Sequence, residues 1–248
     1  MTEVAPAISM GLPVKSNGVG TYRPMQSERR RIFMPLKEHV VITGTGRTGT
    51  TVLIELLTHL GLDTGFSVDD LASKKDTQAR AGLEHDIRSK DCPFIVKSPW
   101  FCDHADEVIS RDDIVLKHVF IPVRDLNAAA ESRRRVVKAN VASMPLGKRL
   151  KYTVRPRLLA GGLWGTNSRK PGKQEEVLLR KLYGLILALS DNSLPVTFMR
   201  YPKILKDCPY LFGKLKPILG DIAYGTFYAA FCKTIRPELI NSFNDRDR

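Results

Sequence analysis

The sequence has no long hydrophobic run. Nowhere do 18 uncharged apolar residues follow one another, and the first residues lack the apolar core of a secretory signal peptide. We therefore expect a soluble, cytoplasmic protein without a transmembrane segment. Any contact with a membrane would be peripheral and would depend on surface charge.

Cysteine is scarce, with four residues among 248. No two of them form a C-x-x-C pair, and none has the spacing typical of metal ligands. They fall in or beside apolar segments, where free cysteine packs as a small hydrophobic residue, and they are Cys92, Cys102, Cys208 and Cys232. We expect reduced, buried thiols and no bound metal.

Acidic residues are outnumbered by basic ones, 26 against 39, so the formal net charge at pH 7 is +13. Such a surface attracts anions, and nucleic acid, an anionic membrane, a polyanionic glycan and a charged nucleotide all qualify. Charge alone does not choose among them.

The length and the 43% hydrophobic content suit one sizeable core rather than two. Residues 1–36 are rich in Gly, Pro, Ser and charge and show no sustained period, which predicts an irregular N-terminal arm. Residues 37–248 are then a single α/β domain. We find no internal repeat.

Short apolar runs alternate with segments of helical periodicity, which is typical of crossover units and a parallel sheet. The predicted strands are Val40–Thr43, Phe94–Lys97, Val119–Val123 and Val196–Met199. The predicted helices are Thr51–Leu60, Thr77–Ser89, Ala105–Arg111, Leu126–Val141, Glu175–Asn192 and Tyr210–Leu219. The fold class expected is a three-layer α/β/α sandwich with a central parallel sheet, of the P-loop nucleotide-binding type.

The stretch VVITGTGRTGTT, from Val40 to Thr51, joins an apolar strand to a helix through a glycine-rich turn. Backbone N–H groups and a helix N-terminus on such a turn attract a phosphate. Gly44, Gly49 and Thr51 fit the nucleotide P-loop pattern, but Thr50 stands where that pattern requires lysine. A cation occurs instead at Arg47, which would fork onto a terminal oxyanion.

A second anion-binding point follows the third predicted strand, in IPVRDLNAAAESRRR. Arg124 lies at the end of that strand, and Ser132 follows eight residues later, about two helical turns into the next element. Because ligands bind beyond the carboxyl ends of parallel strands, both points would face one crevice. Two separated anion sites indicate a ligand with two separated phosphates. Arg133, Arg134 and Arg135 are expected to form a solvated basic face, although one of them could assist this second anion site.

These two motifs together resemble the sulfotransferases that use 3′-phosphoadenosine 5′-phosphosulfate (PAPS), in particular bacterial and Golgi-type members with an R-T-G-T-T loop. The resemblance covers about Val40 to Leu219, and TFMRYPKILKD, Thr197 to Asp207, is similar to a late strand and turn of that family. It implies a transfer of the sulfuryl group from PAPS to a hydroxyl or amine of a small-molecule or glycan acceptor, without a metal.

The resemblance also implies roles for individual residues. The 5′-phosphosulfate would bind to Gly46, Arg47, Thr48, Gly49, Thr50 and Thr51. The 3′-phosphate would bind to Arg124 and Ser132. The site would contain Lys97, which closes the second strand and would contact the transferring group.

The catalytic base is less well marked. Some relatives place a histidine two residues after this lysine, where the chain has Pro99. Other relatives use a glutamate from the region after the first helix, so the resemblance favours Glu84 as the base, with His85 next and Asp69 and Asp70 behind them. Trp100 and Phe101 would either floor the acceptor pocket or belong to the core. The basic, glycine-rich stretch 144–173, with Trp164, Arg169, Lys170 and Lys173, would be a lid or a flexible surface loop.

Two other functions fit parts of the sequence. A P-loop kinase or NTPase would need a substitute for the missing lysine and an acidic partner for Mg²⁺, and the second strand ends in Lys and Ser instead. A non-enzymatic binder of nucleic acid or another polyanion would fit the charge, but no stripe of basic and aromatic residues is visible, so no specific nucleic acid is expected.

Overall fold

The computed structural model describes residues 36–76, 81–145 and 172–236. The chain divides into two compact units, residues 1–34 and 35–248, and every described residue belongs to the second. The predicted arm, residues 1–36, lies outside the described residues except for Leu36 and stays a prediction, as does the assignment of residues 37–248 to one domain.

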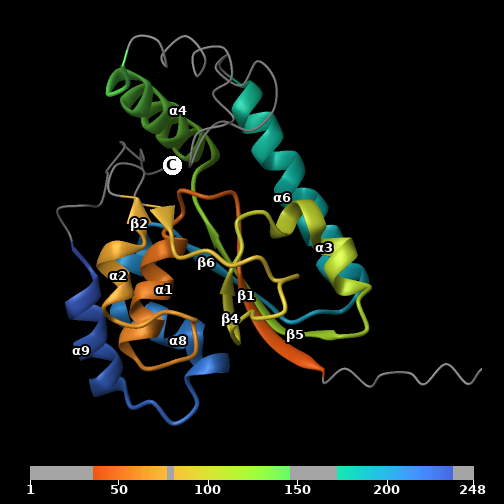
Figure 1. The fold of residues 1–248 in the computed structure, drawn as a ribbon, viewed down its shortest axis with the longest axis vertical. Coiled ribbons are helices and arrows are strands. Elements are labelled where there is room, and N and C mark those ends of the chain that lie inside the picture. The colour runs from red at the N-terminus through yellow and green to blue at the C-terminus, as the bar shows by residue number, and fades with distance from the viewer. Residues whose placement is uncertain (1–35, 77–80, 146–171, 237–248) are drawn as a thin grey trace, which may run out of the picture. The chain divides into compact units, whose positions relative to one another are not determined.

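The described residues contain one four-stranded sheet in which every strand runs parallel. The order is β4-β1-β5-β6 (Figure 1), with β1 (Lys37–Ile42), β4 (Ile95–Lys97), β5 (Ile114–Val123) and β6 (Val196–Arg200). Because β1 lies between β4 and β5, the loop after β1 leaves from the interior of the sheet. A separate antiparallel pair is formed by β2 (Lys75–Asp76) and β3 (Ala81–Gly82).

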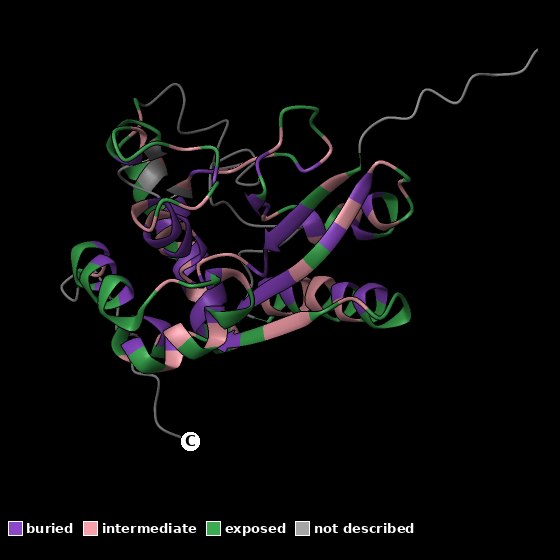
Figure 2. Cartoon of the chain, turned by 90° about the horizontal axis from the view of Figure 1, so that it is seen from below, coloured by how far each residue is buried: buried purple, intermediate pink, exposed green. Residues whose placement is uncertain are grey.

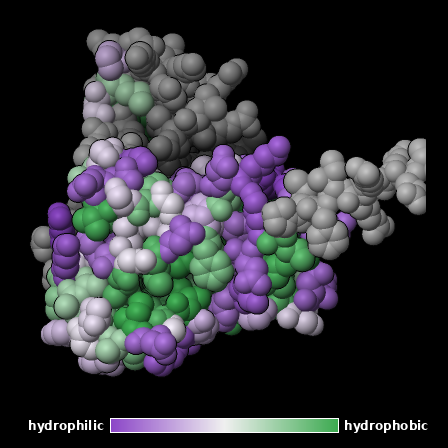
Figure 3. Space-filling model, turned by 60° about the horizontal axis from the view of Figure 1, so that its bottom comes forward, coloured by the Kyte–Doolittle hydropathy of each residue, from purple (hydrophilic) through white to green (hydrophobic). Residues whose placement is uncertain are grey.

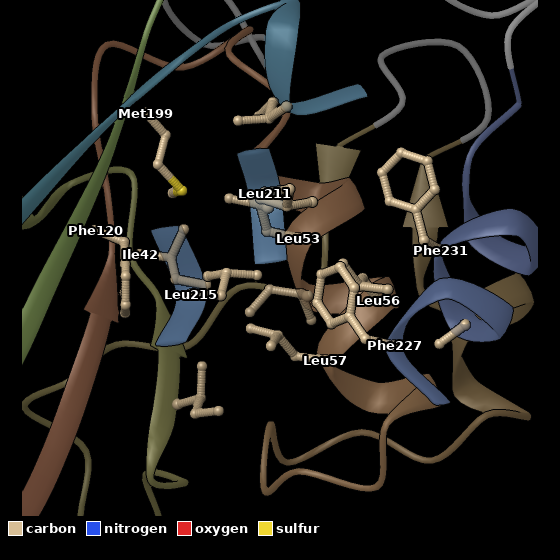
Figure 4. Packing of buried hydrophobic residues seen from close by; sticks show 14 of the residues in the cluster. Ile42, Leu53, Leu56, Leu57, Phe120, Met199, Leu211, Leu215, Phe227 and Phe231 are labelled. Carbon is tan, nitrogen blue, oxygen red and sulfur yellow. The ribbon is translucent and has the colours of Figure 1, made fainter. Parts of the chain in front are cut away.

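One face of the sheet is covered by α1 (Thr50–His59), α8 (Cys208–Leu219) and α9 (Tyr224–Thr234). Alternate strand residues such as Ile42, Phe120 and Met199 point into this layer. Figure 4 shows them beside leucines of α1 and α8 and the phenylalanine rings of α9. This is the largest of the three buried clusters of the described residues, and it holds α1, and so the loop before it, against the sheet.

The opposite face is covered by α3 (Phe101–Ile109) and α6 (Lys173–Asp191). Val41, Val96 and Val119 point into this side because the side chains of a strand alternate between its faces. The helix α4 (Leu126–Ala142) packs against α6 at Leu178. The fold is therefore a three-layer α/β/α sandwich, as the sequence predicted, and Figure 2 shows buried strands between helices that are exposed on their outer sides.

All four predicted strands are confirmed within a few residues, and so are five of the six predicted helices. The exception is Thr77–Ser89, of which 77–80 lie outside the described residues. Residues 81–89 form β3 and then turns, with Gly82 at φ 116° and Leu83 at φ 55°. Such values interrupt a helix, and the apolar residues Leu83 and Ile87 are instead buried from an irregular segment. The helices α2 (Asp70–Ser73), α7 (Lys203–Lys206) and α9 and the strand pair β2 and β3 were not among the predicted elements.

The expectation of buried thiols is wrong for part of the set. Cys208 is buried and Cys232 is exposed, while Cys92 and Cys102 lie between these extremes. Cys232 is near the end of α9, a helix that the sequence analysis did not predict, so its outward face could not be anticipated.

Two surface features complete the fold. Within the described ranges, every helix is too short or too polar to cross a lipid bilayer. Hydrophobic and hydrophilic side chains share the face that Figure 3 turns to the viewer.

Candidate anion-binding and transfer site

The loop between β1 and α1 has a backbone shaped for an anion. Gly44, Gly46, Arg47 and Gly49 all have positive φ, at 144°, 68°, 60° and 84°. Successive N–H groups in a tight turn of this kind can point toward one side and form an anion-binding nest. The glycines allow this geometry without strain, whereas Arg47 adopts it with a side chain.

The loop leads directly into α1, whose first turn is left open. Gly49 is the N-cap residue, and no side chain of the described residues caps the helix. The first N–H groups of a helix have no partner within it and carry the positive end of the helix dipole. The nest and the helix N-terminus therefore present donors to the same ligand position.

The predicted second anion point lies beside this loop. Arg47 donates from Nε to Ser132 Oγ at 3.3 Å, and Arg124 donates from Nη1 to the carbonyl oxygen of Arg47 at 3.3 Å. Asp125 caps α4 by accepting from the Ala128 N–H at 2.8 Å, so the element that carries Ser132 begins directly after Arg124. The structure thus brings together Arg47, Arg124 and Ser132, three residues that the sequence assigned to one ligand.

Arg133 is buried, so the prediction that it lies on a solvated face is wrong. It is 3% exposed, and its Nε and Nη2 both donate to the Thr45 carbonyl oxygen from beneath the loop. A Cβ on Gly46 would lie 2.5 Å from Nη2. The sequence allowed one arginine of the run to assist the site but did not indicate which one, because that depends on how α4 packs.

The other two arginines of the run have different surroundings. Arg134 is partly buried and pairs with both carboxylate oxygens of Glu175 at 2.8 and 2.6 Å, whereas Arg135 is exposed. The solvated face predicted for the run is therefore correct for Arg135 alone.

Tyr201 is a second residue whose contact with the loop the sequence did not reveal. The guanidinium carbon of Arg124 lies 4.8 Å from the centre of the Tyr201 ring, a cation–π distance. A Cβ on Gly49 would lie 3.2 Å from the same ring. Tyr201 therefore supports both the arginine and the start of α1, and the late motif TFMRYPKILKD does reach the site.

Lys97 and Glu84 are brought together on the other side of the loop. The Lys97 ammonium is 3% exposed and donates to Glu84 Oε1 at 3.0 Å, to Thr51 Oγ1 at 2.9 Å and to the Gly82 carbonyl oxygen at 2.6 Å. Burial lowers the pKa of Lys97, and the charge of Glu84 opposes that shift. Glu84 itself is about a quarter exposed and so remains accessible from solvent.

His85 follows Glu84 but its side chain faces elsewhere. Its ring centre lies 4.6 Å from that of Phe66, and Nε2 would be 2.8 Å from a Cβ on Gly65. Burial lowers the pKa of His85. Asp70, a lower-ranked base candidate, accepts from the Ser67 N–H and hydroxyl and pairs with Lys74. Neither side chain is brought to Arg47 or Lys97 by the contacts of the described residues.

The site carries an excess of positive charge. Burial, followed by the nearby charge of Arg47, lowers the pKa of Arg133 to about 10. The charge of Arg47 also lowers the pKa of Lys97. The positive charges of Arg47, Lys97 and Arg133 repel one another in a site that is largely buried, and a bound dianion would relieve that repulsion.

The remaining candidates are divided. Phe101 is buried in the core, while Trp100 is exposed at the start of α3. The hydroxyl of Thr48 is buried without a hydrogen-bond partner among the described residues. Lys173 begins α6 and pairs with Glu176, and Trp164, Arg169 and Lys170 lie outside the described residues.

No protein-family model matches the chain, and neither the curated proteins nor the solved structures gave a significant match. Among residues 36–76, 81–145 and 172–236, no group of three or more His, Cys, Asp or Glu side chains is placed to hold a metal ion. What the site can do is therefore inferred from its own residues.

Proposed function

We propose that the chain is a PAPS-dependent sulfotransferase with a P-loop type of nucleotide site. The observation that carries the proposal is the contact of the two motifs, in which Arg47 donates to Ser132 and Arg124 donates to the Arg47 carbonyl oxygen. A loop that cradles one phosphate would by itself fit many nucleotides. A second cationic point joined to it favours a nucleotide with separate 5′ and 3′ groups.

The backbone N–H groups of Gly46 to Thr51 would hold the 5′-phosphate, and Arg47 would bridge it to the sulfuryl oxygens. Arg124 and Ser132 would hold the 3′-phosphate, with Tyr201 keeping the guanidinium of Arg124 in place. Thr50, in the place of the P-loop lysine, leaves no cation for a γ-phosphate from that position. The buried Lys97 supplies positive charge from the neighbouring strand instead.

In the reaction, the bond between the sulfuryl sulfur and the 5′-phosphate oxygen breaks, and a bond from sulfur to the acceptor oxygen or nitrogen forms. Negative charge develops on the leaving phosphate, and Arg47 and the loop N–H groups stabilise it. The acceptor proton leaves to a base. We assign this role to Glu84, because its carboxylate lies 3.0 Å from Lys97 and is accessible, whereas the ring of His85 packs on Phe66.

The test is thermal stabilisation of the full chain by adenosine 3′,5′-bisphosphate and by ATP. A ligand that binds only the folded state raises the melting temperature by mass action. We expect a concentration-dependent rise with the bisphosphate, a smaller one with ATP, and loss of the difference in Arg124→Ala. Arg135→Ala is the matched control, since this arginine lies on α4, the helix that begins just after Arg124, but is exposed, and it should keep the full response.

Other results would favour other functions. A rise with ATP that depends on Mg²⁺ and exceeds the rise with the bisphosphate would indicate a kinase or NTPase. Salt-dependent binding of DNA or RNA, with no response to the bisphosphate, would indicate a polyanion binder. Either result would overturn the proposal.

A further inference from the structure

A cavity of about 60 Å³ lies just beyond the end of β4, between that strand and the start of α3. Its lining includes Ser98, whose N–H donates to the carbonyl oxygen of Ile42, the last residue of β1. The cavity therefore begins one residue after Lys97, at the same edge of the sheet as the anion-binding loop. The proposed phosphate site follows β1 and this cavity follows β4, and these two strands are parallel neighbours in the sheet.

Trp100, one of the two tryptophans in the sequence, lines the cavity and is 46% exposed. Trp100 is the N-cap residue of α3, but its side chain makes no capping hydrogen bond, and the adjacent Phe101, 1% exposed, supplies the core contact at this point. A large aromatic ring exposed beside a cavity is a typical ligand platform, because one indole face is apolar and free to stack.

The charge around the cavity differs from that around the loop. Arg88 donates to both carboxylate oxygens of Asp86, at 2.9 and 2.7 Å, and to Glu107 at 3.2 Å. One guanidinium is thus shared between two carboxylates. The pKa of Asp86 is held at about 2, chiefly by its hydrogen bond to Arg88, so this carboxylate stays ionised. Arg88 lines the cavity together with Asp86, but its single positive charge is shared by two carboxylates, so a carboxylate or sulfate on a ligand would meet a net negative charge here.

The remaining polar groups suit hydroxyls. Ser98, His104 and the carboxylate of Asp86 all line the cavity, and together they offer donors and acceptors. About 10–15 Å³ suffices for one water molecule. A cavity of about 60 Å³ accordingly has room for a hydroxyl or hydroxymethyl substituent but not for a whole ring.

We propose that this cavity is the acceptor subsite and that it takes an uncharged, hydroxylated ring such as a pyranose. The ring would stack on Trp100, and one substituent would enter the cavity toward Ser98, His104 and Asp86. This inference rests on the proposed sulfotransferase function. It narrows the acceptor to neutral compounds, although the chain as a whole is strongly basic.

The two tryptophans allow a direct test. The variant Trp164→Phe leaves Trp100 as the only tryptophan of the full chain, and its emission is followed as methyl β-D-glucopyranoside or glucuronate is added. We expect a saturable change with the neutral glucoside and binding of glucuronate that is weaker by about tenfold or more. No saturable change with the glucoside, or equal or tighter binding of glucuronate, would overturn the proposal.

Two further variants in the same background test the charge argument. Asp86→Asn keeps the shape of the side chain and should reduce the discrimination against glucuronate. Asp106→Asn, on the exposed face of α3 and outside the cavity lining, is the matched control and should leave it unchanged. An equal effect of both substitutions would contradict a local role of Asp86.

The outcome is separable from that of the nucleotide test. Stabilisation by adenosine 3′,5′-bisphosphate without a glucoside response would reject the subsite alone. A glucoside response without nucleotide stabilisation would reject the sulfotransferase function and leave a sugar-binding cavity.

Discussion

Arg47 combines a charge that the site needs with a backbone conformation that suits glycine. Its φ of 60° places it in the left-handed region, between glycines that adopt similar values. For a residue with a Cβ, this conformation costs about 1–2 kcal/mol. Strain of this kind is typical of functional sites, which agrees with the role proposed for the guanidinium of Arg47.

Replacing Arg47 separates the two requirements. Arg47→Gly relieves the strain and Arg47→Ala does not, so we expect the glycine variant to have a free energy of unfolding higher than that of the alanine variant by about 0.5–1 kcal/mol. Both lack the guanidinium and should lose stabilisation by adenosine 3′,5′-bisphosphate. Urea denaturation gives the first quantity and thermal shift the second. Retention of the bisphosphate response in either variant would show that the guanidinium is dispensable.

Lys97 is the second residue at which position and charge conflict, because its ammonium is almost fully buried. Glu84→Ala removes its only carboxylate partner among the described residues and leaves two neutral oxygens. We expect a loss of about 1–3 kcal/mol in the free energy of unfolding. Glu84→Gln retains an oxygen acceptor and should lose less.

The matched control is Glu38→Ala, which breaks the exposed ion pair of Glu38 with Lys117. Exposed pairs contribute about 0–1 kcal/mol, so this loss should be small. Equal losses in Glu84→Ala and Glu38→Ala would mean that Lys97 does not depend on Glu84. If Glu84 is also the base, sulfuryl transfer should fall in Glu84→Gln even where that variant is stable.

At the scale of elements, the loop before α1 depends on Arg133 beneath it. Gly46→Ala would place a Cβ 2.5 Å from Nη2 of Arg133 in a residue with φ 68°. Gly61→Ala is the matched control, since Gly61 has φ 75° but no atom near the added Cβ. Both variants carry the left-handed strain of about 1–2 kcal/mol. Gly46→Ala should lose more stability in urea denaturation and also bisphosphate binding, and equal behaviour of the two would refute the close packing.

The elements also indicate what a single sequence can predict. Strands β1, β5 and β6 and helices α1, α4, α6 and α8 were found because periodic apolar residues record the side that each one buries. The loop was predicted because its glycines permit the positive φ values that such a turn requires. Thr77–Ser89 was wrong because its apolar residues are buried without regular structure.

For the site, the residues that lie on the loop or at strand ends were predictable. Arg133 and Tyr201 were not, because their contacts with Thr45 and Gly49 join residues far apart in the chain. Which residue of an arginine run turns inward depends on how α4 packs, and a lone sequence does not record that packing. In the same way, only the packing of α3 decides that Phe101 is buried and Trp100 is exposed.

For the molecule as a whole, positive charge is distributed unevenly. The net charge of +13 predicts attraction of anions everywhere. Locally, the cations Arg47, Arg124 and Arg133 gather at the loop. At the cavity after β4, the one arginine among the described lining residues, Arg88, is shared between Asp86 and Glu107, so acidic groups are in excess there. One edge of the sheet thus offers a cationic position and an acidic one side by side. A donor nucleotide and a neutral acceptor would be sorted between them by charge.

Three histidines couple the stability of the whole fold to pH. Burial lowers the pKa of His39, His85 and His118 below the ordinary value of 6.5. Between the lowered values and 6.5, the unfolded chain binds more protons than the folded chain, so the free energy of unfolding rises with pH in that interval. We expect it to be lower at pH 5.5 than at pH 7.5, two values at which most carboxylates remain ionised.

Urea denaturation at the two pH values measures this difference, and one substitution assigns part of it. His118 Nε2 and Thr197 Oγ1 form a hydrogen bond of 2.8 Å, and the centre of the His118 ring lies 4.4 Å from that of the tilted Phe120 ring. His118→Gln keeps a polar group near Thr197 but does not titrate, so its stability should change less between pH 5.5 and 7.5 than that of the unmodified chain. A free energy of unfolding that is equal or higher at pH 5.5 in the unmodified chain would contradict the assignment. A histidine whose pKa is lower in the folded chain than in the unfolded chain must reduce the free energy of unfolding when it is protonated.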